Sequence, residues 1–243
     1  MSFLLIPVAP LSRTKSRLRD CLSKEQLKEL TIAMFRDLGK KLAEIEGFED
    51  IIVYCHDTEI LELAEIFGLV GIKEQLTKPR KTFDQVISDL NTVAINKFNA
   101  QQTIFSFLDT VLISAKNFNE INLLLKKNQL VVCPAIHSAG VSVLGRNPPN
   151  IISTYFSDPT IPSFIALIHN AKKKGLDKIA IYDSFRAGFD IDIKQDLLLA
   201  YHYLRILNLQ NTETYKYLQN NLNLSLQKSS VNDNRKLKIT KKK

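Results

Sequence analysis

Short apolar runs alternate along this chain with longer segments in which apolar residues recur every three or four positions. The short runs are rich in β-branched and aromatic residues, which is typical of strands. They predict strands at residues 3–8, 51–55, 70–72, 103–108, 130–133, 142–144, 151–155 and 179–182. The run at 179–182 is expected to be buried and to form the last strand of the chain.

Helical spacing fills the intervals between these strands. Ser23 is expected to open the first helix, because Gln26 three residues later completes a capping box, and Gly47 is expected to stop it. Asp57 is expected to cap a short helix that ends just before Gly68. Further helices are predicted at residues 83–98, 118–127, 162–174 and 194–207.

This alternation of strands and helices predicts an α/β fold with a mostly parallel, doubly wound sheet. We expect a single main domain at residues 1–207, a helical appendage at 208–227 and a basic, disordered tail at 228–243. Six of the last nine residues are Lys or Arg, so much of the net charge of +8 lies in that tail. The folded part is therefore close to neutral, and nucleic-acid binding is not expected.

Two further observations bear on the cellular setting. No apolar run approaches the roughly 18 residues of a membrane-spanning helix, and the N-terminal run is too short for a signal peptide. Cys21, Cys55 and Cys133 are odd in number and widely spaced, which favours reduced thiols over disulfides or a zinc site. Together these features predict a cytoplasmic protein with no membrane partner.

The strongest chemical signal is the segment at residues 179–192, I-A-I-Y-D-S-F-R-A-G-F-D-I-D. Asp190 and Asp192 are two residues apart, so in an extended segment both side chains point to the same face. Two carboxylates on one face repel each other unless a cation lies between them, and a hard cation such as Mg²⁺ prefers such oxygen ligands. The alternative for this pair alone is a solvated acidic turn.

Groups that could form one site with Asp190 and Asp192 follow other predicted strands. Asp109 follows the strand at 103–108, and a loop of small residues follows the strand at 130–133. The loop after the first strand carries four cations, Arg13, Lys15, Arg17 and Arg19. In open α/β sheets, ligands bind at the carboxyl ends of the strands. Cations and small-residue loops suit phosphates while carboxylates suit Mg²⁺, so the combination predicts a site for nucleotidyl transfer.

Other common site signatures are missing from the sequence. It has no G-x-x-x-x-G-K-[ST] phosphate loop, no G-x-G-x-x-G dinucleotide fingerprint and no G-x-S-x-G nucleophile motif. The four histidines share no metal-ligand spacing, and His137 in the small-residue loop is expected to be a surface residue. Catalysis by a nucleophilic serine or by a histidine cluster is therefore not supported.

Two stretches resemble one known family, the 2-phospho-L-lactate guanylyltransferases. The opening I-P-V followed by K-S-R-L, with Ala33, Met34, Arg36 and Asp37 in the next helix, is similar to the start of these enzymes. The segment I-Y-D-S-F-R-A-G-F-D-I-D-x-x-x-D-L is similar to their C-terminal signature. The resemblance implies the fold of the nucleotide-diphospho-sugar transferases, which molybdopterin nucleotidyltransferases share.

By this resemblance, Asp109, Asp190 and Asp192 would hold Mg²⁺, and Lys15 and Arg17 would contact the triphosphate, Arg17 as part of the catalytic set. The residues implied for binding the phosphorylated acid are Pro134, Gly140, Val141, Ser142 and Ser163. The middle of the chain departs from the family pattern. The proline after Asp109 is lost, and in the P-A-I-H-S-A-G-V-S loop Val141 replaces a threonine and Ser142 an asparagine.

The implied reaction joins GMP from GTP to 2-phospho-L-lactate or phosphoenolpyruvate, with release of pyrophosphate, in coenzyme F-420 biosynthesis. The acceptor phosphate is already anionic near neutral pH, so the attack on the α-phosphorus needs no general base. The partners are thus GTP and a small phosphorylated carboxylic acid, and a homodimer is compatible with this role. Two alternatives stay open: another NTP or acceptor, such as 3-phosphoglycerate, and a nucleotide-binding homologue that has lost catalysis.

Overall fold

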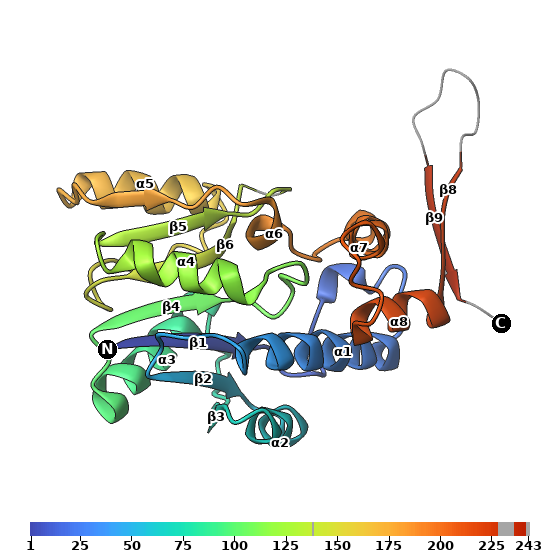
Figure 1. Ribbon diagram of the computed structural model, residues 1–243, viewed down its shortest axis with the longest axis horizontal. Coiled ribbons are helices and arrows are strands. Elements are labelled where there is room, and N and C mark those ends of the chain that lie inside the picture. Colours follow the sequence, from blue (N-terminus) through green and yellow to red (C-terminus); the bar gives the residue numbers. More distant parts are fainter. Residues whose placement is uncertain (138, 228–235, 242–243) are drawn as a thin grey trace.

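The computed structural model describes residues 1–137, 139–227 and 236–241. Its main element is a seven-stranded sheet with strand order β3-β2-β1-β4-β6-β5-β7 (Figure 1). Only β6 runs antiparallel to its neighbours β4 and β5, so the predicted mostly parallel sheet is confirmed. The strands are β1 (Ser2–Val8), β2 (Asp50–Cys55), β3 (Val70–Lys73), β4 (Gln102–Ser106), β5 (Leu130–Pro134), β6 (Val141–Arg146) and β7 (Ile179–Ile181).

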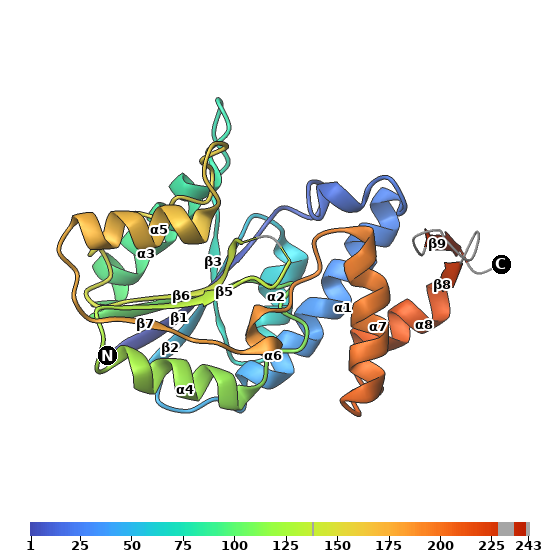
Figure 2. The same cartoon turned by 90° about the horizontal axis from the view of Figure 1, so that it is seen from above.

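Helices cover both faces of the sheet, as in a doubly wound fold (Figure 2). One face packs on α3 (Phe83–Phe98) and α5 (Ser163–Lys173), and the other on α1 (Lys24–Leu42), α2 (Thr58–Ile66) and α4 (Ala115–Leu125). Alternate residues of β1 divide between the two layers: Leu4 and Ile6 face α1, whereas Phe3 and Leu5 face α3. This alternation follows from the two-residue period of a strand.

The predicted caps and ends of the first two helices are partly confirmed. Ser23 caps α1 with the predicted capping box, but α1 ends at Leu42, before Gly47. Asp57 precedes α2 without capping it, because its carboxylate accepts the backbone N–H of Leu11 at 2.9 Å instead. That contact fixes the loop after β1, which forms the short 3₁₀ helix η1 (Ser16–Leu18).

One predicted strand does not form. Residues 151–155 are irregular, although Ile152 is buried in the layer beneath α3 and α5. The Asp84 carboxylate at the start of α3 accepts the backbone N–H groups of Phe156 and Ser157 at 2.9 and 2.8 Å and the Thr154 hydroxyl. The buried Arg146 guanidinium also donates to the Ile152 carbonyl at 2.8 Å. Side-chain hydrogen bonds and apolar burial therefore hold this segment without strand pairing.

The strand β7 is shorter and more exposed than predicted. It lies at the edge of the sheet and pairs only with β5, and Ile181 is 47% exposed. Ile179 packs against one layer and Ala180 against the opposite one, but both are only half-buried.

The C-terminal region differs most from expectation. After α6 (Phe185–Gly188) and α7 (Lys194–Ile206), residues 208–227 contain α8 (Glu213–Asn221) and then β8 (Leu222–Gln227). The strand β8 pairs antiparallel with β9 (Lys236–Lys241) in a hairpin that projects from the body in Figure 1. The expected disordered tail is therefore wrong for residues 236–241, and its other positions, 228–235 and 242–243, lie outside the described residues. The strand at 179–182 is not the last one.

No helix in the described part of the chain is long and apolar enough to cross a membrane. All three cysteines are free, with Cys55 and Cys133 buried and Cys21 half-buried, as the sequence predicts. Burial raises the pKa of Cys55 to about 12 and that of Cys133 to about 11, so both thiols stay protonated near neutral pH.

Asp37 attaches the C-terminal helices to the main body. This buried residue of α1 accepts the backbone N–H groups of Glu213 and Thr214 at 2.8 and 2.7 Å, at the first turn of α8. A carboxylate is favourable there because the first N–H groups of a helix have no partner within the helix.

We expect Asp37→Ala to lower the free energy of unfolding by about 1–3 kcal/mol, because two N–H groups of α8 lose their acceptor. Denaturant titration measures this change. The exposed residue Glu44, just beyond α1, supplies the control variant Glu44→Ala. Equal stability of the two variants would contradict the proposed anchoring by Asp37.

Candidate active site

Three carboxylates converge at the carboxyl edge of the sheet. One oxygen atom each from Asp109, Asp190 and Asp192 lies within 4.8 Å of the others. Asp109 is three residues beyond the end of β4, and the other two lie between α6 and α7. The Ile191 N–H donates to the Asp109 carbonyl at 3.1 Å, so the two segments are also joined through their backbones. The structure thus brings together the three carboxylates that the sequence singles out.

The segment at residues 189–192 alternates as predicted. Phe189 and Ile191 are fully buried in the layer beneath α1, whereas Asp190 and Asp192 are only half-buried. The apolar pair therefore holds one face of this extended segment in the core and presents both carboxylates on the other.

Lys15 inserts its ammonium group among these carboxylates. Its Nζ contacts the Asp109 carboxylate, donates to the Ile191 carbonyl at 2.5 Å and lies 3.4 Å from Asp192. Burial lowers the pKa of Lys15, but the charges of Asp109, Asp192 and Asp190 outweigh burial, and the pKa is raised overall. The backbone of Lys15 is left-handed, with φ of 47°, an uncommon conformation for a residue with a side chain.

Arg17 approaches the same cluster from solvent. Its side chain is 68% exposed, and Nη1 lies 3.0 Å from Asp192. Lys15 and Arg17 were expected to contact a triphosphate; in this structure both pair with the carboxylates. Arg17 can turn toward a phosphate with little loss of packing, whereas Lys15 is 9% exposed and would have to leave three acceptors.

Asp190 is the carboxylate with the least compensation. Burial first, and then the negative charges of Asp109 and Asp192, raise its pKa to about 7, although Lys15 acts in the opposite direction. Among the described side chains, Asp190 takes part in no ion pair. Lys15 therefore compensates the negative charge of Asp190 only in part, as expected where a cation is to bind.

The three carboxylates fit a hard divalent cation. The donor set is all oxygen, and trans ligands of an octahedral Mg²⁺ lie about 4 Å apart, comparable with the spread of these oxygen atoms. The Lys15 ammonium uses the same Asp109 and Asp192 carboxylates, so a cation bound there would compete with it.

Asp196 is a site residue that the sequence analysis missed, and its partner His137 is exposed, as the sequence predicts. The buried Asp196 carboxylate accepts the backbone N–H groups of Asp192 and Ile193, both at 2.8 Å, and lies 2.9 Å from Nδ1 of His137. The His137 ring also packs edge-on against Phe189. The D-x-x-x-D spacing ahead of a helix could have indicated this role, because an acid at the third helical position commonly accepts the N-cap N–H.

Gly188 allows the small-residue loop to approach the carboxylates. A Cβ at this position would lie 2.6 Å from the Pro134 carbonyl oxygen, closer than any real contact. The Ile136 N–H donates to the Gly188 carbonyl at 2.9 Å, which joins the loop to α6. The loop at residues 135–140 and the acidic segment are therefore positioned together, although Ser138 lies outside the described residues.

The residues expected to bind the acceptor acid surround this loop. Pro134 ends β5 and pairs with Val141, and the Gly140 carbonyl accepts the N–H of Ala135 at 3.0 Å. Val141 is buried, and the buried Ser142 hydroxyl donates to the Cys133 carbonyl at 3.1 Å, so neither side chain is presented to a ligand.

Ser163 lies close to the same loop. It is the first residue of α5, whose N-cap residue is Pro162 and has no side-chain cap. The next residue, Phe164, donates its N–H to the Ala139 carbonyl at 3.2 Å and ties the helix start to the loop.

A cavity of about 680 Å³ lies at the ends of β1, β2 and β3. It is bounded by the loop after β1 and by the segment between β3 and α3, which projects from the molecule in Figure 2. Ser12 and Arg13 line it, and the same loop continues to Lys15 and Arg17 at the carboxylates. The volume is typical of small-molecule sites. One loop therefore connects a ligand-sized cavity to the acidic cluster.

A family model described as "Guanylyl transferase CofC like" matches residues 2–241. The chain belongs to this family. It is 31% identical over 194 residues to the 2-phospho-L-lactate guanylyltransferase of Methanocaldococcus sp. (strain FS406-22), covering 79% of this chain and 78% of that protein. It is 26% identical over 245 residues to the enzyme of that name from Methanobrevibacter ruminantium, covering 98% of both chains. The family resemblance is thus confirmed.

Solved structures confirm the expected fold of this guanylyl transferase family member. A protein assigned as a nucleotide-diphospho-sugar transferase, from Desulfovibrio desulfuricans G20, superposes with a TM-score of 0.71 at 14% identity, covering 90% of this chain and 94% of that one. CMP:2-keto-3-deoxy-manno-octonic acid synthetase in complex with CTP gives 0.55 at 12% identity, covering 86% and 99%.

Gly188→Ala is expected to reduce the stability of the protein by about 1–3 kcal/mol, because the new methyl group overlaps a backbone oxygen that cannot move alone. Denaturant unfolding tests this. Gly71→Ala is a matched control, since a Cβ there would meet only ordinary contacts with Leu61, the nearest at 3.4 Å. Similar losses in both variants would argue against a special close approach at Gly188.

Asp190→Asn should change how stability depends on pH. The pKa of Asp190 is raised to about 7 in the fold, so stability in the absence of metal is lost as pH rises from the unfolded value near 4 to about 7. The variant lacks this loss. The melting temperature of the variant minus that of wild type should therefore increase as pH rises through this window, and then stay constant. Thermal scans with EDTA at several pH values measure the difference; a constant difference would contradict the shift.

Proposed function

We propose that this protein transfers GMP from GTP to a small phosphorylated carboxylic acid, 2-phospho-L-lactate or phosphoenolpyruvate, and releases pyrophosphate. The proposal includes Mg²⁺ dependence, a role in coenzyme F-420 biosynthesis and a cytoplasmic setting. Its main support is the convergence of Asp109, Asp190 and Asp192 in a chain of the guanylyl transferase family. The names of the relatives support the choice of substrates.

GTP would bind along the loop that follows β1. The cavity beside Ser12 and Arg13 would receive the nucleoside, and the triphosphate would extend toward Lys15 and Arg17. Arg17 is exposed and held by a single ion pair, so it is the cation best able to exchange Asp192 for a phosphate oxygen. Its planar guanidinium suits two oxygen atoms of the leaving pyrophosphate.

The acceptor would bind on the other side of the carboxylates. The first turn of α5 would offer backbone N–H groups other than that of Phe164, which donates to Ala139, and Ser163 would add a hydroxyl at the helix N-terminus. Such groups favour an anion. Pro134, Gly140, Val141 and Ser142 would contribute through backbone and shape, because the side chains of Val141 and Ser142 are buried.

The reaction needs alignment and charge neutralisation more than proton transfer. The acceptor phosphate has a second pKa of about 6 and is largely dianionic near pH 7, so it can attack the α-phosphorus directly. Mg²⁺ held by Asp109, Asp190 and Asp192 would supply Lewis-acid stabilisation of the phosphoryl oxygen atoms. The cationic side chains of Lys15 and Arg17 would reduce the repulsion between the two anions and stabilise charge on the pyrophosphate.

The acceptor loop favours a second candidate, a nucleotidyltransferase for another phosphorylated acid such as 3-phosphoglycerate. The observation behind it is the apolar Val141 where the family shows threonine, together with the inward-facing Ser142 hydroxyl. Loss of two polar contacts in the acceptor pocket would alter the acids that fit. GTP use and the carboxylate cluster are the same in both candidates.

The test is pyrophosphate release from GTP and Mg²⁺ with 2-phospho-L-lactate, phosphoenolpyruvate or 3-phosphoglycerate. We expect turnover with one of the first two acids, and Asp192→Asn should reduce it by several orders of magnitude because a metal ligand is lost. Asp183→Asn is the matched control, since this exposed carboxylate lies outside the cluster. Near-normal turnover of Asp192→Asn, or none with any acid, would contradict the proposal.

A further inference from the structure

Glu74 is a buried carboxylate in the wall of the cavity at the ends of β1, β2 and β3. It follows β3 directly and is only 6% exposed. Its N–H donates to the Cys55 carbonyl at 2.8 Å and its carbonyl oxygen lies 3.2 Å from Nδ1 of His56, so its backbone continues the pairing of β2 with β3. The position of this side chain is therefore set by the sheet rather than by a flexible loop.

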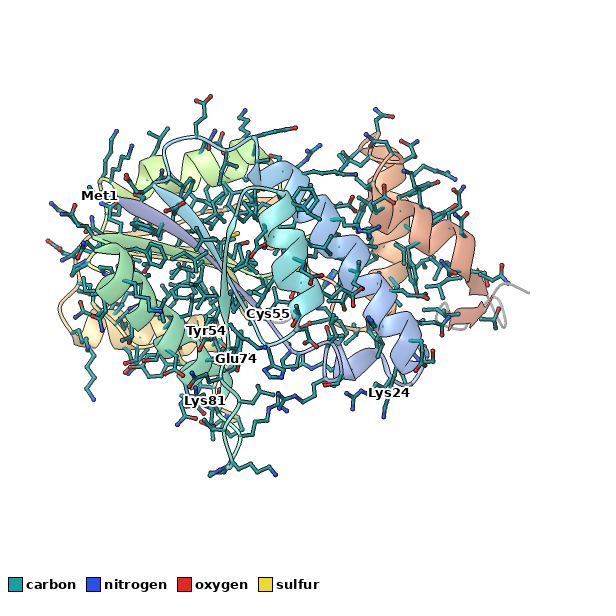
Figure 3. All side chains as sticks on the ribbon, turned by 90° about the horizontal axis from the view of Figure 1, so that it is seen from below. Met1, Lys24, Tyr54, Cys55, Glu74 and Lys81 are labelled. Atoms are coloured by element: carbon teal, nitrogen blue, oxygen red, sulfur yellow. The ribbon has the colours of Figure 1, made fainter. Side chains whose placement is uncertain are left out.

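The Glu74 carboxylate accepts no hydrogen bond from the residues that the structure describes, although its backbone is paired. Lys81 is the cation with the largest electrostatic effect on Glu74, but it forms its ion pair with Asp89, at 2.5 Å. Figure 3 labels Tyr54, Glu74 and Lys81, which lie near one another at this end of the sheet. Burial raises the pKa of Glu74 despite the positive charges of Lys81, Arg13, His56 and Arg80. The Glu74 carboxylate lines the cavity and its oxygen atoms are not fully buried, so they can accept hydrogen bonds from the donors of a bound ligand.

The cavity also offers an aromatic surface. Phe83 lines it and is 42% exposed, and its ring is held by Phe107 and Phe156 at centroid distances of 5.6 and 5.8 Å. A fixed, half-exposed ring is suited to stacking on a nucleobase. Val86 and Pro7 extend the apolar wall.

We propose that Glu74 recognises guanine, by accepting hydrogen bonds from N1–H and the exocyclic N2–H₂ group of the base. This inference rests on the proposed use of GTP and names the residue that selects it. A carboxylate offers two acceptor oxygen atoms and no donor when ionised. Guanine carries two N–H donors side by side on one edge, whereas cytosine, adenine and uracil place an acceptor next to their donor. Glu74 therefore matches guanine and leaves an unfavourable acceptor–acceptor contact with the other bases.

Glu74→Gln tests the inference, with nucleotide affinities measured by calorimetry in the absence of an acceptor acid. Wild type should bind GTP about 10- to 100-fold more tightly than ITP, which lacks the exocyclic amine, and the variant should lose most of this preference. The glutamine amide can instead accept from N1–H and donate to a C2 carbonyl, so the variant should gain affinity for XTP. Gain of XTP binding is a result that general damage to the cavity cannot produce.

Glu65→Gln is the control, because it removes the same charge from an exposed position on α2. The variant Glu74→Gln should remain folded, with an unchanged or higher melting temperature, since it removes a buried charge. An equal loss of affinity for all nucleotides would overturn the inference in favour of a ribose contact, and equal binding of GTP and ITP by wild type would also overturn it. Guanine selectivity without pyrophosphate release would support Glu74 while contradicting the proposed reaction.

Discussion

The contact on which the site depends is the insertion of the Lys15 ammonium among the carboxylates. It joins the loop after β1 to Asp109, 94 residues away, and to Asp192, 177 residues away. Without a positive charge, three carboxylates this close would repel one another and separate the segments that carry them. Lys15 thus holds the site together in the absence of a metal, and it occupies the oxygen atoms that a metal would use. Under the proposed function, metal binding would therefore be coupled to release of this lysine toward the phosphates.

Hydrogen bonds and packing around the carboxylates support this charged centre. Asp196 fixes the backbone of Asp192, Gly188 admits the Pro134 carbonyl, and Phe189 and Ile191 anchor the acidic segment in the core. These residues explain why the sequence pattern around Asp190 and Asp192 includes more positions than these two candidate metal ligands. Each extra position in that signature meets a packing or hydrogen-bonding requirement that keeps the carboxylates in place.

The sequence predicted the sheet class, most element positions and all three carboxylates, because these depend on local period and on the rule that parallel strands end at one edge. It failed where tertiary contacts decide. Residues 151–155 have strand-like composition, yet the side chains of Asp84 and Arg146 bind Thr154 and the Ile152 carbonyl in place of strand pairing. The tail has the charge of a disordered segment, yet residues 236–241 pair with β8. Glu74 carries no motif, and only its place in the cavity wall draws attention to it.

Within the seven-stranded sheet, the antiparallel strand β6 lies between two groups of loops. Because β6 runs opposite to β4 and β5, the start of β6 meets the carboxyl edge, and the connection from β5 is a short hairpin rather than a helical crossover. Under the proposed function, the loops of β1 to β3 would bind the nucleotide and those of β5, β6 and α5 the acceptor, with the carboxylates between them. Substitutions in the hairpin would then change the acceptor without disturbing the nucleotide. Such an arrangement would let the preferences for acceptor and donor evolve separately.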